Sequence, residues 1–183
     1  MGQAPQPLAG IKVLDLSRVF AGPVCGRILS DLGADVVKVE PPEGDVTRLW
    51  GRKAAGLSTY YVQQNVGKQN ISIDLRKDGG PALVRELVKH SDIVVENFRP
   101  GVMAKYGLDY DSLRQHKPDL VMASISGFGQ DGPESGRAAY AAILHGEAGA
   151  IDVSKGVAAA HDISFSAADV LSGMHGVIGL LEA

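Results

Sequence analysis

Short apolar, β-branched runs alternate with longer helical stretches, and this alternation constrains the fold more than any other feature of the sequence. Five runs have strand length and are nearly continuous in apolar residues, as strands covered on both faces of a parallel sheet must be. They span residues 12–16, 34–40, 70–75, 92–98 and 119–126. The pattern predicts an α/β fold, a Rossmann-like open parallel sheet flanked by helices.

Helix signals lie between these runs. In GPVCGRILSDLG, Pro23 suits a first helical turn and Gly33 suits a helix stop. The stretch 81–90 is expected to be a helix with one apolar face, made of Leu83, Val84, Leu87 and Val88. The long connection 41–69 is compatible with either a loop or a short helix around residues 57–64.

Two helices are predicted after the last strand. The first covers residues 138–148, and the second begins near Ser164 or Ser166, either of which suits an N-cap, and continues to the last residue. Its apolar part is shorter than the ~20 residues that a bilayer requires, so a buried helix is expected. Because this helix has no stop signal, we expect it to expose an apolar surface at Gly173, Val177 and Leu180.

Length and composition exclude several classes of protein. The 183 residues suit one domain, 1–183, and the net charge of -3 gives no global reason to bind nucleic acid. A single cysteine, Cys25, rules out an intramolecular disulfide, and no Cys/His spacing indicates a zinc site. The N-terminus lacks the pattern of a signal peptide, so a cytoplasmic protein with no membrane partner is predicted.

Two strand-to-helix connections are candidate anion sites. Glycines 22, 26 and 33 do not form the dinucleotide fingerprint, so NAD and FAD are not indicated, and Gly22-Pro23 by itself indicates only a helix start. Asn97-Phe98-Arg99 closes the fourth strand, where an aromatic ring and a guanidinium suit a purine and a phosphate. An ordinary loop with an exposed arginine explains that segment equally well.

Among the titratable residues, Asp169 stands in an apolar context that would desolvate a carboxylate nucleophile. Composition alone favours a simpler role, an acidic residue in the first turn of a helix. His145 and His175 are expected to be packing or capping residues, and Cys25 a buried structural thiol. The pair His161-Asp162 is expected to be a surface feature.

Six segments, taken in order, resemble the class III CoA-transferases, the family of formyl-CoA, carnitine and related CoA-transferases and the α-methylacyl-CoA racemases. The segments are GIKVLDLSRVFAGP, DLGADVVKVEPPEGD, NVGKQNISIDL, DIVVENFRPGVMAKYGLDY, SISGFGQDGP and ADVLSGMHGVIGLL. Together they cover nearly the whole chain.

The resemblance implies a nucleophile and a set of residues that contact CoA. The family's nucleophilic aspartate corresponds to Asp169, which replaces the simpler interpretation given above. A basic residue that some members carry after the second strand is Pro41 here. The implied CoA-contacting residues are Phe20, Ala21, Ile73, Asp74, Leu75, Arg76, Asn97, Phe98, Arg99, Lys105, Arg137 and Tyr140.

The implied activity is movement of CoA from an acyl-CoA donor to a small carboxylic acid, through an aspartyl mixed anhydride and an aspartyl-CoA thioester, with no metal. Two alternatives remain, a racemase and a non-catalytic CoA-binding fragment. The family's racemases carry a histidine where this chain has Ala139-Tyr140-Ala141, which favours the transferase. Family members are longer and form interlocked homodimers, so this chain corresponds to the N-terminal half of such a fold.

Overall fold

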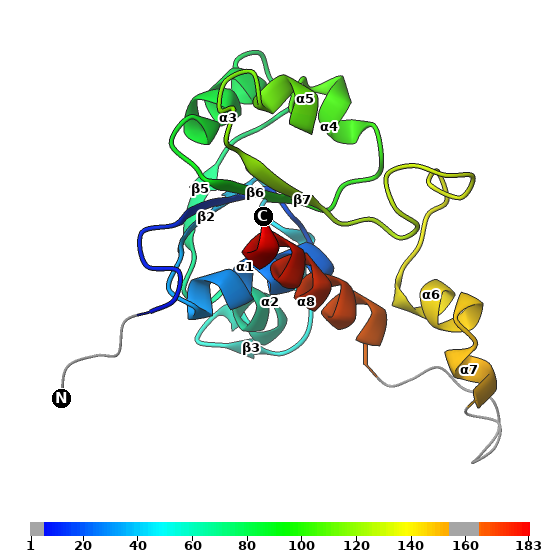
Figure 1. Cartoon of the computed structure of the whole chain (residues 1–183). Helices are drawn as coiled ribbons and strands as arrows, with labels where there is room; N and C mark the ends of the chain where they lie inside the picture. The colour runs from blue at the N-terminus through cyan, green and yellow to red at the C-terminus, as the bar shows by residue number, and fades with distance from the viewer. Residues whose placement is uncertain (1–5, 154–164) are drawn as a thin grey trace.

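The computed structural model describes residues 6–153 and 165–183, and their centre is one parallel sheet (Figure 1). Its five strands lie in the order β5-β2-β1-β6-β7, and every neighbouring pair is parallel. Each strand overlaps one of the predicted runs, so the predicted open parallel sheet is confirmed. The strands are β1 (Lys12–Asp15), β2 (Asp35–Glu40), β5 (Gln69–Ser72), β6 (Ile93–Glu96) and β7 (Val121–Ser124).

Helices cover both faces of this sheet (Figure 1). One face packs against α1 (Ala21–Asp31) and α8 (Ala167–Glu182), with α2 (Thr59–Asn65) beside α1. The other face is covered by α3 (Gly80–Val88), α4 (Val102–Lys105) and α5 (Tyr110–Leu113).

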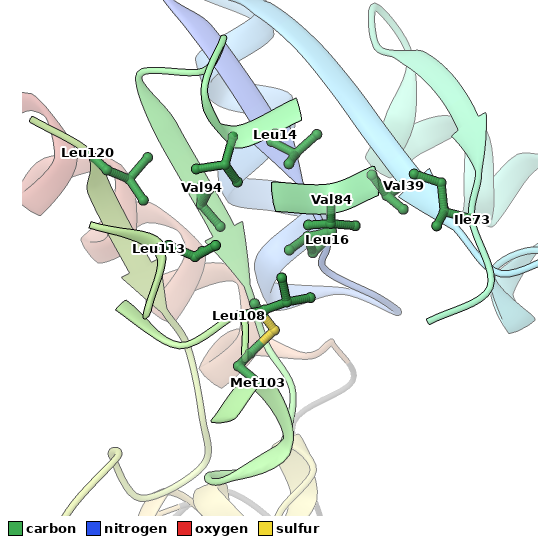
Figure 2. Close-up of a cluster of buried hydrophobic side chains, with 11 residues drawn as sticks. Leu14, Leu16, Val39, Ile73, Val84, Val94, Met103, Leu108, Leu113 and Leu120 are labelled. Carbon is green, nitrogen blue, oxygen red and sulfur yellow. The ribbon is translucent and has the colours of Figure 1, made fainter. Parts of the chain in front are cut away.

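The alternation of side chains along the strands creates two separate cores. In β1, Val13 belongs to the cluster with Cys25 of α1 and Val177 of α8, whereas Leu14 points to the opposite cluster. Figure 2 shows that opposite cluster, which includes Leu14 and Val94 of the sheet together with side chains of α3, α4 and α5. Burial on both faces therefore explains the near-continuous apolar runs of the central strands β1 and β6, whereas the edge strand β5 is exposed.

Two expectations about helix faces need correction. Val84 and Val88 of α3 are fully buried as predicted, but Leu83 lies at the edge of the face and is 58% exposed. In α8, Gly173, Val177 and Leu180 are buried against the sheet and α1, contrary to the prediction. The exposed apolar face of α8 is instead made of Leu171, Met174, Ile178 and Leu181.

The connection between β2 and β5 is more structured than predicted. It contains the 3₁₀ helix η1 (Val46–Leu49), a hairpin of β3 (Lys53–Ala54) and β4 (Leu57–Ser58), and then α2, which confirms the short helix. The segment is fastened to the sheet by Glu40 at the end of β2. Its carboxylate accepts hydrogen bonds from Arg48, Tyr61 and Asn70, and from the backbone amide of Asp45.

After β7 the chain leaves the sheet and forms α6 (Ala141–Glu147) and α7 (Ala150–Val153). Helix α6 begins three residues later than predicted, and the residues before it, 137–140, have no regular secondary structure and line a cavity. Helix α8 begins directly after Ser166, one of the two predicted capping residues, although the Ser166 side chain makes no capping hydrogen bond.

Candidate active site

The candidate site lies where the strand order reverses. From β1 the chain continues to β2 and β5 on one side, then returns to β6 on the other side of β1, and ligands of open α/β sheets bind at the carboxyl ends of such strands. The loops that follow β1 and β6 are joined there. The amide of Arg18 donates to Oδ1 of Asn97 at 2.7 Å, and Nδ2 of Asn97 donates to the carbonyl of Arg18 at 2.8 Å.

A cavity of about 420 Å³ opens between these loops, the segment after β7, the residues preceding α6, and the first turn of α8. It brings together most of the residues that the family resemblance implied. Asp169 lines it, and so do Phe20, Ala21, Asn97, Phe98, Arg99, Arg137 and Tyr140. These residues come from parts of the chain that are far apart in sequence, and the parallel sheet gathers them at one edge.

The remaining implied residues lie outside this cavity. Ile73 is buried in the core, and Asp74 and Arg76 form an ion pair with each other at 2.7 Å. Leu75 packs against the same core, and Lys105 is exposed at the end of α4. All five follow β5 or β6, at the same edge of the sheet, and their contact with CoA stays a prediction.

Asp169 occupies the first turn of α8, where the helix dipole favours a negative charge. Burial removes water from its carboxylate and raises its pKa above the usual value, while His145 and the backbone amide of Ala21 pull the pKa the other way. The carboxylate is thus only partly solvated and is held close to the start of α1. A desolvated carboxylate beside a cavity is suited to nucleophilic attack.

A second, smaller cavity of about 290 Å³ is also lined by Asp169. Three aromatic residues, Phe20, Trp50 and Tyr60, form part of its wall, and the Tyr60 ring lies 5.6 Å from each of the other two rings. Sequence reasoning did not single out Tyr60. It lies in the long connection between β2 and β5, and only the fold brings it near Asp169.

The mouth of the larger cavity carries cationic and aromatic groups. The guanidinium of Arg18 lies 5.1 Å from the centre of the Phe98 ring, and Arg99 beside it is exposed. Arg137 lies 4.6 Å from the centre of the Phe128 ring and pairs with Glu134 and Glu147. Guanidinium groups and aromatic faces are suited to phosphate and purine groups.

His145 and Cys25 have the roles expected, whereas His175 is exposed in the middle of α8, contrary to the expected packing or capping role. His145 is buried and accepts a hydrogen bond at Nε2 from the amide of Ala168, so it is a capping residue. The Nδ1 atom of His175 lies 2.8 Å from the carbonyl oxygen of Leu171 in its own helix. Cys25 is fully buried, which raises its pKa to about 12, as befits a structural thiol. The pair His161-Asp162 lies outside the described residues.

Two further properties concern the described residues only. Within residues 6–153 and 165–183, no three or more His, Cys, Asp and Glu side chains are grouped so that they could hold a metal ion. No helix in the same part of the chain is both long enough and apolar enough to cross a membrane.

Comparison with known proteins gives a consistent result. The family model for CoA-transferase family III matches residues 8–183. A succinate–glutarate CoA-transferase of Agrobacterium fabrum is 49% identical over 80% of this chain and 39% of its own length. The human succinyl-CoA:glutarate CoA-transferase is 41% identical over 81% of this chain and 34% of its own length.

Among solved structures, a CAIB/BAIF family protein from Brucella suis superposes with a TM-score of 0.92 and 42% identity, over 98% of this chain and 49% of that one. The chain therefore spans less than half the length of these relatives. The family match extends from before β1 to the end of α8, and the Brucella suis structure shares the whole sheet and its covering helices. This chain belongs to CoA-transferase family III.

Proposed function

We propose that the complete protein transfers CoA from an acyl-CoA to a carboxylic acid, with Asp169 as the nucleophile. The observation that carries the proposal is the position of the Asp169 carboxylate. It is partly desolvated and lies beside two cavities, one of which is lined by seven of the residues that the family resemblance links to CoA. Such an arrangement lets one carboxylate meet the donor and the acceptor in turn.

The proposed reaction proceeds in four balanced steps. A carboxylate oxygen of Asp169 attacks the thioester carbonyl, the C–S bond breaks, and CoA departs as a thiolate, so that Asp169 and the donor acid form a mixed anhydride. The thiolate then attacks the side-chain carbonyl of Asp169 and expels the donor carboxylate, which leaves an aspartyl-CoA thioester. The acceptor carboxylate attacks this thioester and expels the CoA thiolate, which gives a second anhydride. The thiolate then attacks the acceptor carbonyl of this anhydride and expels the carboxylate of Asp169. The products are the new acyl-CoA and the restored carboxylate of Asp169.

We propose dicarboxylic acids as the substrate class. The relatives named for succinate and glutarate, for D-citramalate and for L-malate all act on acids with two carboxyl groups or more. The smaller cavity offers the phenol of Tyr60 and the indole of Trp50 around Asp169, and such groups can hold an acid by hydrogen bonds while excluding water. Exclusion of water protects both anhydrides and the thioester from hydrolysis.

A racemase is less well supported. His145 lies near Asp169, and two such groups could in principle carry a proton on and off a substrate. However, Nε2 of His145 already accepts the hydrogen bond from the Ala168 amide, and the chain has Ala139-Tyr140-Ala141 where the family's racemases carry their histidine. The transferase is therefore the preferred function.

We further propose that residues 1–183 form the CoA-binding domain of a longer cytoplasmic protein that works as an interlocked homodimer. The resemblance to the family and the coverage of about half of the Brucella suis chain support this proposal. The apolar face of α8, with Met174 and Ile178, would be covered in that assembly.

Trapping of the covalent intermediate tests the proposed function. The complete protein is incubated with succinyl-CoA and hydroxylamine, which attacks an activated aspartyl carbonyl and leaves a hydroxamate. Mass spectrometry should then locate the modification on Asp169, and the Asp169→Asn variant should remain unmodified. Neither a racemase nor a binding domain acylates a carboxylate. An unmodified Asp169, under conditions in which CoA demonstrably binds, would contradict the transferase mechanism.

A further inference from the structure

We infer that the buried residue Asp45, supported by Lys38, is a positioning residue for CoA transfer. It holds Val19 in a strained backbone conformation and thereby fixes the loop that lies against Asp169. This inference rests on the proposed function of Asp169. Its evidence does not depend on that function, because it comes from the backbone conformation of Val19 and from the hydrogen bonds that hold residues 17–19.

Val19 has a φ of 67°, in the left-handed region that residues other than glycine rarely adopt. For a β-branched residue this conformation is especially unfavourable, since its Cβ and both methyl groups crowd the backbone. Strained residues persist where the surrounding structure holds them, and they gather at functional sites. Val19 lines both cavities, so its strain lies at the candidate active site itself.

Asp45 holds the strained residue directly. Its Oδ2 accepts a hydrogen bond from the Val19 amide at 3.0 Å, while its Oδ1 accepts two from Thr47, at 3.0 and 2.8 Å. The Asp45 side chain is almost fully buried, and a buried carboxylate that accepts several hydrogen bonds is rigid. The hydrogen bond to Val19 therefore ties the loop after β1 to the start of η1.

Lys38 and Asn97 hold the two residues that precede Val19. The Nζ atom of Lys38 donates to the carbonyl of Ser17 at 2.7 Å and lies 3.5 Å from Oδ2 of Asp45. Asn97 makes hydrogen bonds to both the amide and the carbonyl of Arg18. Three consecutive residues, Ser17 to Val19, are thus restrained by buried or partly buried side chains of other segments.

The restrained loop continues directly into the contact with the nucleophile. Phe20 precedes α1 and lines both cavities with Asp169, and Ala21, the first residue of α1, lines the larger cavity with Asp169. The loop has little room to shift, because a Cβ placed on Gly22 would collide with the Ser17 side chain. A change in the backbone at Val19 would consequently shift Phe20 and Ala21 relative to the carboxylate of Asp169.

A double-mutant cycle in the complete protein tests this inference. In Asp45→Asn, the amide nitrogen either replaces Oδ2 and faces the donors of Val19 and Lys38, or replaces Oδ1 and faces those of Thr47. Val19→Gly removes the strain, because glycine adopts a positive φ without restraint. We expect Asp45→Asn to lower kcat at least about tenfold relative to the parent protein. In the Val19→Gly background, the same substitution should lower kcat less than about threefold relative to Val19→Gly alone.

The matched control is Val19→Ala, which shortens the side chain but keeps the Cβ that opposes a positive φ, and it should not rescue Asp45→Asn. KM for succinyl-CoA should change by less than about threefold, because the loop positions the nucleophile more than it binds the donor. An equal loss of kcat in both Val19 backgrounds would overturn the inference, and so would an unchanged kcat. A failure of Asp45→Asn to fold that Val19→Gly does not reverse would also overturn it.

Hydrogen exchange separates this inference from the proposed function. In the complete protein, Asp45→Asn should increase amide exchange in the peptide that spans residues 17–22, whether or not the protein transfers CoA. Loss of all transferase activity in the unmodified protein, together with this increase, would contradict the proposed function alone. Unchanged exchange in an active protein would contradict the role of Asp45 alone.

Discussion

The backbone amide of Ala168 donates a hydrogen bond of 3.2 Å to Nε2 of His145, which lies on a different helix. Helix α8 thus receives from α6 the cap that its own Ser166 does not provide. Because Nε2 accepts this hydrogen bond, the proton of a neutral His145 ring is on Nδ1. The bond links the wall that carries Tyr140 to the helical turn that carries Asp169, so His145 should influence the position of the carboxylate.

Replacing His145 by leucine should therefore lower kcat more than it changes KM. Leucine fills the space but leaves the Ala168 amide without its acceptor, and loss of a helix cap typically costs about 1 kcal/mol. We expect kcat to fall by roughly tenfold, since small displacements of a reacting group are costly. His145→Gln, which retains an acceptor, should keep more of the activity. Steady-state kinetics measure kcat and KM of both variants. Equal kcat values for His145→Leu and His145→Gln would contradict the role of His145 as a cap of α8.

Asp169→Asn should abolish CoA transfer while CoA affinity stays within roughly tenfold, because a nucleophile acts on the chemistry more than on ground-state binding. The same variant should be more stable than the parent at neutral pH. Burial raises the pKa of Asp169, so ionisation of this group opposes folding above that pKa. The difference in stability should shrink as the pH falls and the parent carboxyl becomes protonated. Calorimetry at several pH values and a CoA-binding titration check these outcomes.

The sheet was predictable because the central strands carry runs of successive apolar residues, a pattern that can be recognised within each short segment of the sequence. Burial on both faces requires apolar side chains at successive positions, as in Val94 and Val95. The β3–β4 hairpin has no comparable signal. Its turn places Ala55 and Gly56 at φ values of 50° and 82°, and an alanine at the first of these positions lacks the Asn-Gly pattern that normally marks such turns.

The candidate site likewise contains residues that could be identified from the sequence and residues that could not. Asp169 and the loop around Asn97 were identified from the family resemblance, and the carboxyl ends of parallel strands then bring them together. The supporting residues were not identified. Asp45 and Tyr60 lie in a long connection without periodicity, and their roles depend on where Glu40 anchors that connection in space.

The anchoring role of Glu40 predicts a pH-dependent stability. Burial alone would raise the pKa of Glu40, but hydrogen bonds from Arg48, Tyr61 and the Asp45 amide outweigh burial and lower the pKa to about 2. A lowered pKa means that the ionised group stabilises the fold above about pH 4.5 and that this contribution is lost as the pH falls towards about 2.

Glu40→Gln should accordingly destabilise the protein by roughly 1–3 kcal/mol at neutral pH, and the difference from the parent should narrow in acid. Glu43→Gln is the matched control, because Glu43 makes an exposed ion pair with Arg76 and should contribute little. Urea denaturation at about pH 7 and about pH 3 measures both variants. A pH-independent loss for Glu40→Gln would rule out a contribution from its ionised form.

Substitution of glycine by alanine should have opposite effects at two positions of α8. A Cβ on Gly173 would lie 2.7 Å from the Ala21 carbonyl and 3.0 Å from the Val24 side chain, whereas a Cβ on Gly179 has no neighbour within 4 Å. Gly173→Ala should therefore force α8 away from α1, destabilise the protein by about 1–3 kcal/mol and displace Asp169 from the Ala21 amide, which lowers kcat. Gly179→Ala should stabilise the helix by up to about 1 kcal/mol and leave kcat unchanged, since alanine loses less backbone entropy on folding. Denaturation curves and steady-state kinetics of the two variants test this prediction. A Gly173→Ala variant with unchanged stability and unchanged kcat would show that the close contact of α1 and α8 does not position the nucleophile.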